Sequence, residues 1–280
     1  MTIRTTQNLV LFFFLLAVSS CIPKGGEETA SYLHIGHTRL YEKGNTIDPE
    51  TEKIEFTKYD MIWIGGDLMG HSTEDRPTLN YLDSIFSFAD PDVIWTLGNH
   101  DYDYHPEWIP EVTNRPLFYT SHKNGITILN LDSQKDSCSI LGKQLDMVKQ
   151  VTDTISRSSH LVVLTHKMVW VYGNDSLSTQ AKSVPNAGFC DHCGYGINPN
   201  NYYSNIYPML LEVKNKGIEV INIAGDIGAK VKSFEYLDEN DIHFLASGVR
   251  SGHDDSMGLL FNHNLKKGTL EWEFKLLKDL

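Results

Sequence analysis

The sequence has no cluster of basic residues, no internal repeat and no low-complexity tract. Its 36 acidic residues outnumber its 24 basic residues, which gives a formal net charge of −12. Because binding to a nucleic-acid backbone needs a positively charged face, we expect no nucleic-acid partner. A chain of 280 residues without repeats is long enough for one large domain, and we expect one.

Cysteine is also scarce, since the chain has only Cys21, Cys138, Cys190 and Cys193. The last two are spaced as half of a structural zinc site, but no second pair is present to complete it. We therefore interpret Cys190 and Cys193 as a local disulfide or as two plain thiols. Three cysteines remain after Cys21, so at least one of them lacks a disulfide partner within the chain.

The N-terminus resembles a bacterial lipoprotein signal. Arg4 gives it a positive start, residues 9–18 form an apolar run too short to span a bilayer comfortably, and the motif VSSC follows. The resemblance implies cleavage before Cys21 and a lipid on its sulfur. The alternative is an ordinary secretory signal with an incidental cysteine.

These features predict the domain boundaries and the location. We expect a signal peptide over residues 1–20, a polar tether over residues 21–30 and one domain over residues 31–280. Both alternatives export the chain. A lipid on Cys21 would anchor it to a membrane of the cell envelope, on the outer membrane or the periplasmic face.

Short, nearly continuous apolar segments alternate with amphipathic ones, which predicts a mixed α/β fold. Apolar stripes predict helices at residues 79–86, 141–155 and 206–213. A polar stretch at about residues 171–200 is too long for a plain connector, so we interpret it as a functional lid. The predicted strands are residues 31–35, 59–66, 92–98, 125–132, 160–166, 218–225, 234–237, 241–247, 258–264 and 269–277.

Several of the predicted strands end in a side chain that can bind a metal. In open α/β sheets, ligands bind at the carboxyl ends of the strands. Oxygen and imidazole groups suit Mn, Fe, Zn or Mg rather than a thiolate-bound metal. The side chains in question are those of His37, Asp67, Asn99, His100, Asp101, His166 and Asp226.

Three motifs resemble those of the calcineurin-like metallophosphoesterases: GGD at residues 65–67, GNHD at residues 98–101 and the histidine of VVLTHK, His166. The resemblance implies two mixed β-sheets sandwiched between helices. It also implies hydrolysis of phosphate esters by two adjacent metals that share a bridging carboxylate. The ligands in that family come from the motifs D-x-H, GD, GNH, a lone His and GHxH.

By this resemblance, one of the two metal sites keeps a full set of ligands. Asp67 corresponds to the bridging carboxylate, and Asn99 and His166 correspond to ligands of the second metal. Asp226 stands at the first histidine of GHxH, and its carboxylate can still coordinate.

The first metal site does not keep its ligands. His37 and Arg39 stand at the Asp and His of D-x-H, and Gly228 stands at the last His of GHxH. Only His37 and Asp67 remain to hold that metal. A guanidinium binds phosphate oxygens, so we predict a single-metal centre in which Arg39 partly replaces the missing charge. In the alternative interpretation, Arg39 pairs with Asp67 or Asp226 in an inert pocket.

The resemblance also implies catalytic roles around the GNHD motif. His100 would stabilise the transition state or protonate the leaving group, and Asp101 would orient its imidazole. Alternatively, Asp101 is a turn residue that holds the loop. Arg250 and His105 are candidate contacts to substrate, and His71 is interpreted as a loop histidine.

Together, these observations predict an exported lipoprotein that hydrolyses phosphate mono- or diesters. We expect one divalent transition metal (Mn, Fe or Zn), with the first of the two metal sites altered. The alternative function is a catalytically inactive binding or sensory lipoprotein that keeps the phosphoesterase fold.

Overall fold

The computed structural model describes residues 28–40, 45–186, 197–250 and 252–280. The predicted signal peptide, Cys21, Cys190 and Cys193 lie outside the described residues, so the predictions about them stay predictions. Within the described ranges, no helix is both long enough and apolar enough to cross a membrane.

One sheet has five strands, in the order β11 (Thr269–Leu276), β10 (Met257–Asn264), β1 (Thr29–Ile35), β2 (Met61–Ile64) and β3 (Val93–Trp95). The strands β1, β2 and β3 run parallel, so their carboxyl ends lie at one edge of the sheet. β10 pairs antiparallel with both β1 and β11.

The other sheet has six strands, in the order β4 (Tyr119–Lys123), β5 (Ile126–Asn130), β6 (His160–Thr165), β7 (Glu219–Ala224), β9 (His243–Ser247) and β8 (Ser233–Leu237). Its four inner strands run parallel, and β4 and β8 are antiparallel edge strands. Both sheets are therefore mixed.

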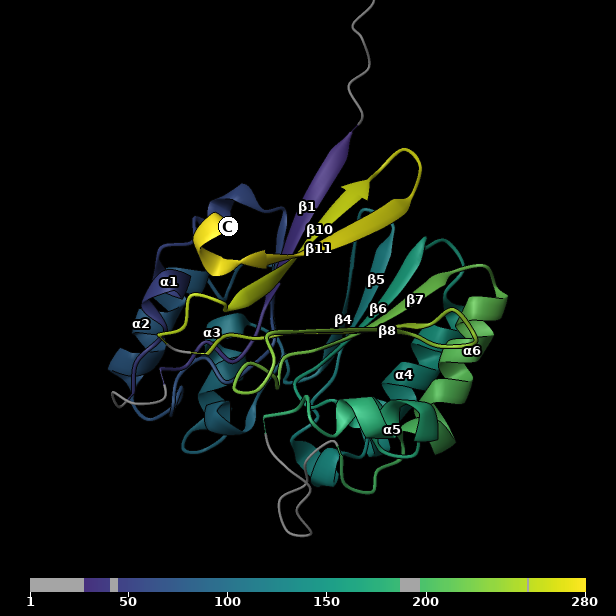
Figure 1. Cartoon of the computed structure of the whole chain (residues 1–280), viewed down its shortest axis with the longest axis horizontal. Helices are drawn as coiled ribbons and strands as arrows, with labels where there is room; N and C mark the ends of the chain where they lie inside the picture. The colour runs from purple at the N-terminus through teal and green to yellow at the C-terminus, as the bar shows by residue number, and fades with distance from the viewer. Residues whose placement is uncertain (1–27, 41–44, 187–196, 251) are drawn as a thin grey trace, which may run out of the picture.

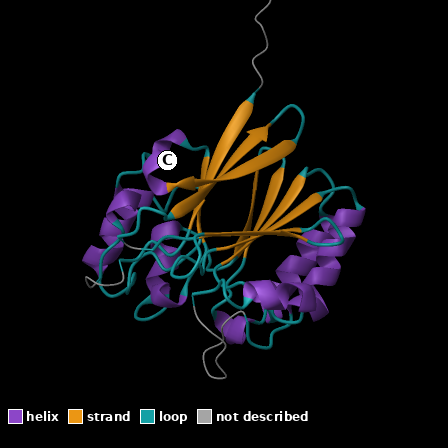
Figure 2. Cartoon of the chain, viewed as in Figure 1, coloured by secondary structure: helices purple, strands orange, loops and turns teal. Residues whose placement is uncertain are grey.

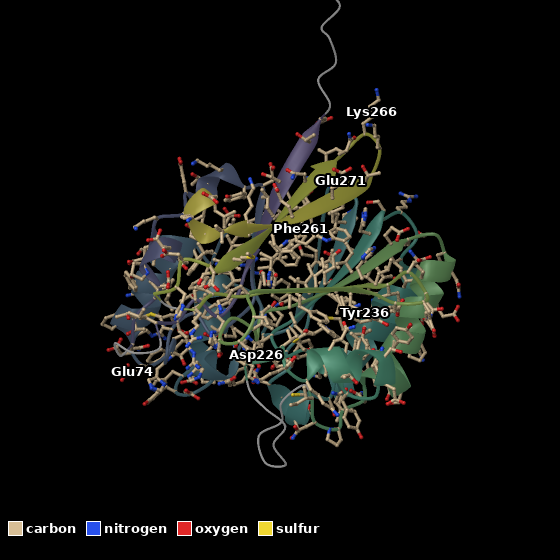
Figure 3. The ribbon with its side chains drawn as sticks, viewed as in Figure 1. Glu74, Asp226, Tyr236, Phe261, Lys266 and Glu271 are labelled. Carbon is tan, nitrogen blue, oxygen red and sulfur yellow. The ribbon has the colours of Figure 1, made fainter. Side chains whose placement is uncertain are left out.

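The two sheets pack face to face, as the orange strands of Figure 2 show. Trp63 and Phe261 of the five-stranded sheet share one buried apolar cluster with Val162 and Ile221 of the six-stranded sheet. Phe261 is labelled between the two layers in Figure 3. Strands buried on both faces explain why these segments read as continuous apolar runs.

The helices cover the outer face of each sheet (Figure 1). They are α1 (Pro49–Glu52), α2 (Arg76–Phe86), α3 (Ile109–Thr113), α4 (Gly142–Thr154), α5 (Asp175–Ala181) and α6 (Tyr207–Asn215). The first three lie beside the five-stranded sheet and the last three beside the six-stranded sheet. The predicted architecture of two mixed sheets flanked by helices is confirmed.

Short helical turns complete the described secondary structure. They are the 3-10 helices η1 (Phe56–Lys58), η2 (Asn99–Asp101), η3 (Pro106–Trp108), η4 (Lys135–Cys138), η5 (Val169–Val171) and η7 (Leu277–Asp279), and the π-helix η6 (Tyr202–Ile206).

Two of these short helices, η5 and η6, flank the predicted lid. The described part of the lid packs onto the six-stranded sheet through buried Leu177, Val184 and Ile197, and a functional role for the lid stays a prediction.

The helix α2 illustrates how local sequence sets these elements. Its N-cap residue, Asp75, accepts a hydrogen bond from the backbone N–H of Thr78, and Ser87 ends the helix in a left-handed conformation. Leu79, Leu82 and Phe86 are buried on one face. The amphipathic stripe in the sequence is therefore the face that packs on the sheet.

Candidate active site

The backbone that follows β1 and β2 lies against the backbone that follows β7, and Gly225 after β7 donates its N–H to the carbonyl oxygen of His166 after β6. A Cβ atom on Gly225 would lie 2.0 Å from the carbonyl oxygen of Gly65, and one on Gly36 would lie 2.7 Å from the Cα atom of Gly225. Only glycine permits this backbone contact. The contact brings the side chains that follow both sheets into one cluster.

Asp67 lies at the middle of this cluster and is buried. Its Oδ1 atom is 3.6 Å from Nε2 of His166, and its Oδ2 atom is 3.7 Å from Nε2 of His37 and 4.0 Å from Nε2 of His100. Burial by itself would raise the pKa of Asp67, but His166, His37, His100 and Lys167 together lower it below its usual range. The carboxylate is therefore ionised at neutral pH.

Asp67 also has a backbone conformation that is uncommon outside glycine, with φ of 53°. The N–H of Asp67 donates to Oδ2 of Asp101, which holds the backbone of Asp67, and the N–H of His100 donates to the side-chain Oδ1 of Asp67. The GGD and GNHD motifs thus support each other, and the strained residue is the one at the centre of the site.

His166 is fully buried and has the arrangement of a metal-binding imidazole. Its Nδ1 atom donates to the carbonyl oxygen of Gly65 at 2.6 Å, which leaves the lone pair on Nε2. That Nε2 atom is buried without a hydrogen-bond partner in the described part of the chain, and it lies 3.9 Å from Oδ1 of Asp226. An orphaned imidazole nitrogen beside the carboxylates of Asp67 and Asp226, with its other nitrogen fixed by a carbonyl, fits a divalent ion.

Lys167 also points into the site, although no motif in the sequence predicts it. It is 1% exposed, and its ammonium donates to Oδ1 of Asn99 at 2.8 Å and to Oδ2 of Asp226 at 3.2 Å. Burial alone would lower the pKa of Lys167, but Asp226 and Asp67 outweigh it and raise the pKa. The only sequence signal was its position beside the strand-end histidine in VVLTHK.

Arg39 donates hydrogen bonds to the imidazoles of His37 and His100. Its Nε atom donates to Nε2 of His37 at 3.2 Å, and its Nη1 atom donates to Nε2 of His100 at 2.5 Å. The guanidinium therefore takes the His37 nitrogen that faces Asp67. Burial lowers the pKa of His37 to about 4, against the opposing effects of Asp67 and Asp226, so this imidazole is neutral.

The residues at the first metal site do not fit a metal ion. The Nε2 atom of His37 is engaged by Arg39, and a guanidinium cannot ligate a cation. Gly228 has φ of 130°, and a Cβ atom there would lie 2.4 Å from the carbonyl oxygen of Val249. The position of the last family histidine therefore has no room for a side chain.

The carboxylate of Asp101 does not orient His100, which corrects the catalytic role predicted for it. The Nδ1 atom of His100 donates to the carbonyl oxygen of Gly70 at 2.6 Å. Asp101 instead holds the loop: its carboxylate accepts hydrogen bonds from the backbone N–H groups of Asp67, Leu68 and Gly98, the hydroxyl of Ser72 and the indole of Trp95.

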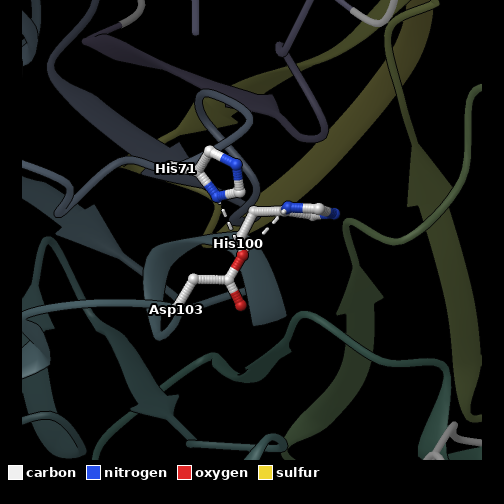
Figure 4. Close-up of side chains that lie close together, drawn as sticks. All are labelled: His71, His100 and Asp103. Carbon is white, nitrogen blue, oxygen red and sulfur yellow. Dashed lines mark hydrogen bonds and ion pairs between the residues drawn. The ribbon is translucent and has the colours of Figure 1, made fainter.

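The carboxylate of Asp103 lies on the Nδ1 side of His100. Its Oδ2 atom lies 3.4 Å from Nδ1 of His100 and 3.1 Å from Nδ1 of His71, as Figure 4 shows. The three side chains are near enough to one another to hold a metal ion. However, the Nδ1 atom of His100 carries the proton that it donates to Gly70, so it has no lone pair for a metal.

The two candidate substrate contacts have partners outside this cluster. Arg250 donates to the backbone carbonyl of Ala229 at 2.9 Å. His105 lies against Glu107 and stacks on the indole of Trp108, with ring centroids 4.1 Å apart. Binding of substrate by either side chain stays a prediction.

Comparison with known proteins agrees with this geometry. The sequence matches the model of the calcineurin-like phosphoesterase family over residues 33–180, which is more than half of the chain. The chain belongs to the calcineurin-like phosphoesterase family. The predicted family is thereby confirmed, and the family performs metal-dependent hydrolysis of phosphate esters in general.

Three solved structures resemble the fold at low identity. Haemophilus influenzae NAD nucleotidase (NadN) is 12% identical with a TM-score of 0.41, and the match covers 88% of this chain and 49% of that one. A Thermus thermophilus 5'-nucleotidase precursor is 10% identical with a TM-score of 0.42, and the match covers 89% of this chain and 54% of that one. Entamoeba histolytica Vps29 complexed with zinc is 12% identical with a TM-score of 0.35, and the match covers 88% of this chain and 99% of that one. The calcineurin-like chain spans about half the length of the two nucleotidases. No curated protein matches its sequence significantly.

Proposed function

We propose that this calcineurin-like phosphoesterase hydrolyses phosphate mono- or diesters with one divalent metal ion. The observation that carries the proposal is the buried Nε2 atom of His166, which lacks a partner in the described part of the chain and lies 3.6 Å from Asp67 and 3.9 Å from Asp226. Two carboxylate oxygens and one imidazole nitrogen suit Mn, Fe or Zn. When bound, such an ion supplies a Lewis acid for a phosphoryl oxygen and lowers the pKa of a bound water.

The charges of the centre support binding of a phosphate ester. The carboxylates of Asp67, Asp226 and Asp101, whose buried side chain accepts from the N–H of Asp67, outnumber the cations Arg39 and Lys167 by one. One divalent ion therefore changes the net charge of the group from negative to positive, which attracts a phosphate anion. Arg39 is half-buried, and its planar fork suits two phosphate oxygens once it leaves the imidazoles.

His100 is the candidate group for proton transfer. Its side chain is partly exposed, and its Nδ1 proton is committed to the carbonyl of Gly70. The Nε2 atom, which now accepts from Arg39, faces the same side as Asp67 Oδ2. When Arg39 turns to bind phosphate, this nitrogen is the one that can exchange a proton with substrate.

The experiment is a metal and turnover measurement on the purified protein. Elemental analysis is expected to give about one transition metal per chain after dialysis against Mn²⁺ or Zn²⁺. Hydrolysis of p-nitrophenyl phosphate and bis-p-nitrophenyl phosphate should appear with added metal and disappear with chelator. Two metals per chain would contradict the single-metal proposal.

The alternative is a catalytically inactive binding or sensory protein. The observation in its favour is that two protein cations already occupy the site: Lys167 binds Asp226, and Arg39 binds His37 and His100. No bound metal and no turnover of either ester would support it.

We also propose that the chain is exported and anchored by a lipid on Cys21. The support is the apolar run over residues 9–18 followed by VSSC. Metabolic labelling with a fatty acid is expected to mark the full-length protein but not a Cys21→Ala variant, and equal labelling of both would contradict the anchor.

A further inference from the structure

The ammonium of Lys167 occupies two of the four groups expected to ligate the second metal. It donates to the amide oxygen of Asn99 at 2.8 Å and to Oδ2 of Asp226 at 3.2 Å. The other oxygen of Asp226, Oδ1, faces His166. Asp226 thus divides its two oxygens between a protein cation and the proposed metal position.

We propose that Lys167 is a built-in cation of the metal centre, which reduces its protein ligands from four to three and thereby weakens divalent metal binding. This inference rests on the single-metal function proposed above. The remaining ligands are Asp67, His166 and Oδ1 of Asp226, while Asn99 and the second oxygen of Asp226 bind the ammonium.

Electrostatics gives the direction of the effect. An ammonium that shares a carboxylate with a divalent cation repels it, and this repulsion is poorly screened because Lys167 is 1% exposed. The amide oxygen of Asn99 accepts a hydrogen bond from the ammonium. If the same oxygen also bound a metal, the ammonium and the metal ion would lie close together and repel each other. Loss of a ligand and repulsion both weaken metal binding.

The same contacts make the centre stable without a metal. Asn99 begins η2 after β3, Asp226 follows β7, and Lys167 follows β6, so the ammonium joins residues from both sheets. Its charge keeps Asp226 from being a buried anion without compensation. Lys167 therefore compensates the charge of Asp226 when no metal is bound.

The experiment is calorimetric titration of Mn²⁺ into metal-stripped protein, with and without Lys167. Lys167→Met keeps the apolar stem and removes the charge. It is expected to bind Mn²⁺ at least about tenfold more tightly than the original protein, the scale of a change beside a metal ligand. Lys167→Gln removes the charge but retains a hydrogen-bond donor for Asp226. It replaces Lys167→Met in the titration if the Met variant does not fold.

Lys123→Met is the matched control. Lys123 pairs with Asp92 at 2.5 Å, at the opposite edge of the sheets, where β4 ends and β3 begins. Its loss is expected to leave the affinity for Mn²⁺ unchanged.

The outcomes separate this inference from the proposed function. Equal or weaker Mn²⁺ binding by both Lys167 variants, with measurable binding by the original protein, overturns the inference and leaves the single-metal proposal standing. Binding only by the Lys167 variants supports the inference and overturns the single-metal proposal. Absence of Mn²⁺ binding by every variant overturns both.

Discussion

The half of the centre around His166 and the half around His37 each have one cationic side chain, but the two side chains bind different groups. In the half around His166, Lys167 binds Asn99 and one oxygen of Asp226, and the imidazole nitrogen stays available. In the half around His37, Arg39 binds the imidazole itself. A cation that takes spare oxygens leaves a metal site with fewer ligands, whereas one that takes the facing nitrogen removes the site.

The largest expected effect tests the Lys167 half through stability. Lys167→Met leaves Asp226 as a buried carboxylate without its ammonium, so the free energy of unfolding of the metal-free protein should fall by about 3–5 kcal/mol. Urea denaturation measures it, and saturating Mn²⁺ should restore part of the loss. A loss no larger than that of Lys123→Met, whose ion pair is partly exposed, would mean that Lys167 is not a structural cation of the centre.

The second prediction tests the nitrogen that distinguishes the two halves. His166→Ala should reduce Mn²⁺ affinity and metal-dependent hydrolysis at least about a hundredfold, because it removes a ligand and its fixed orientation. Calorimetry and a p-nitrophenyl phosphate assay measure the two effects. His122→Ala, on the edge strand β4, is the control and should change neither. Full activity of the His166 variant would reject the proposed metal position.

The third prediction concerns the Arg39 half. Arg39→Ala should lower kcat/KM about tenfold or more, mainly by raising KM, because a charge-assisted contact to phosphate is lost. Arg39→Lys should restore little, since an ammonium lacks the planar fork. Steady-state kinetics measures kcat and KM separately for each variant. Tighter metal binding by Arg39→Ala, with stoichiometry rising toward two ions, would show that Arg39 only blocks the first site.

The smallest expected effect is a pH dependence of stability that comes from buried histidines of the strands rather than from the centre. Burial lowers the pKa of His34 to about 3 and that of His160 to about 4. The unfolded chain binds these protons at a pKa of about 6.5 and the folded chain does not, so stability falls as pH decreases from about 6.5 towards 4 and is insensitive to them above 6.5.

The expected loss at pH 5.5 is about 1 kcal/mol for each histidine relative to pH 7. Urea denaturation of the protein and of His34→Gln over this pH range measures it. An identical slope for the two proteins would show that His34 does not contribute to the pH dependence.

The sequence predicted the fold and the residues that follow the strands. Apolar runs, glycine-rich motifs and amphipathic stripes are local features, so neighbours along the chain are enough to recognise them. The substitutions at His37, Arg39 and Gly228 were visible for the same reason, because each falls at a fixed place in a motif. The assignment of α2 and α4 followed from periodicity alone.

Only the tertiary structure decided where the polar side chains of the loops point. Lys167 is one residue from His166 in sequence, but its role depends on Asn99 and Asp226, which come from other strand ends. Asp101 follows His100 directly, yet its carboxylate turns to the backbone of Asp67 and Gly98, while Gly70 binds the imidazole.

The sequence by itself therefore determined the family, the two sheets and the identity of the altered motif residues. The tertiary structure decided which atoms remain available for a metal. The physical reason is range: periodicity and motif spacing describe neighbours along the chain, whereas hydrogen bonds of buried charges form between strand ends far apart in sequence. Those bonds place one cation on His37 and the other on Asp226.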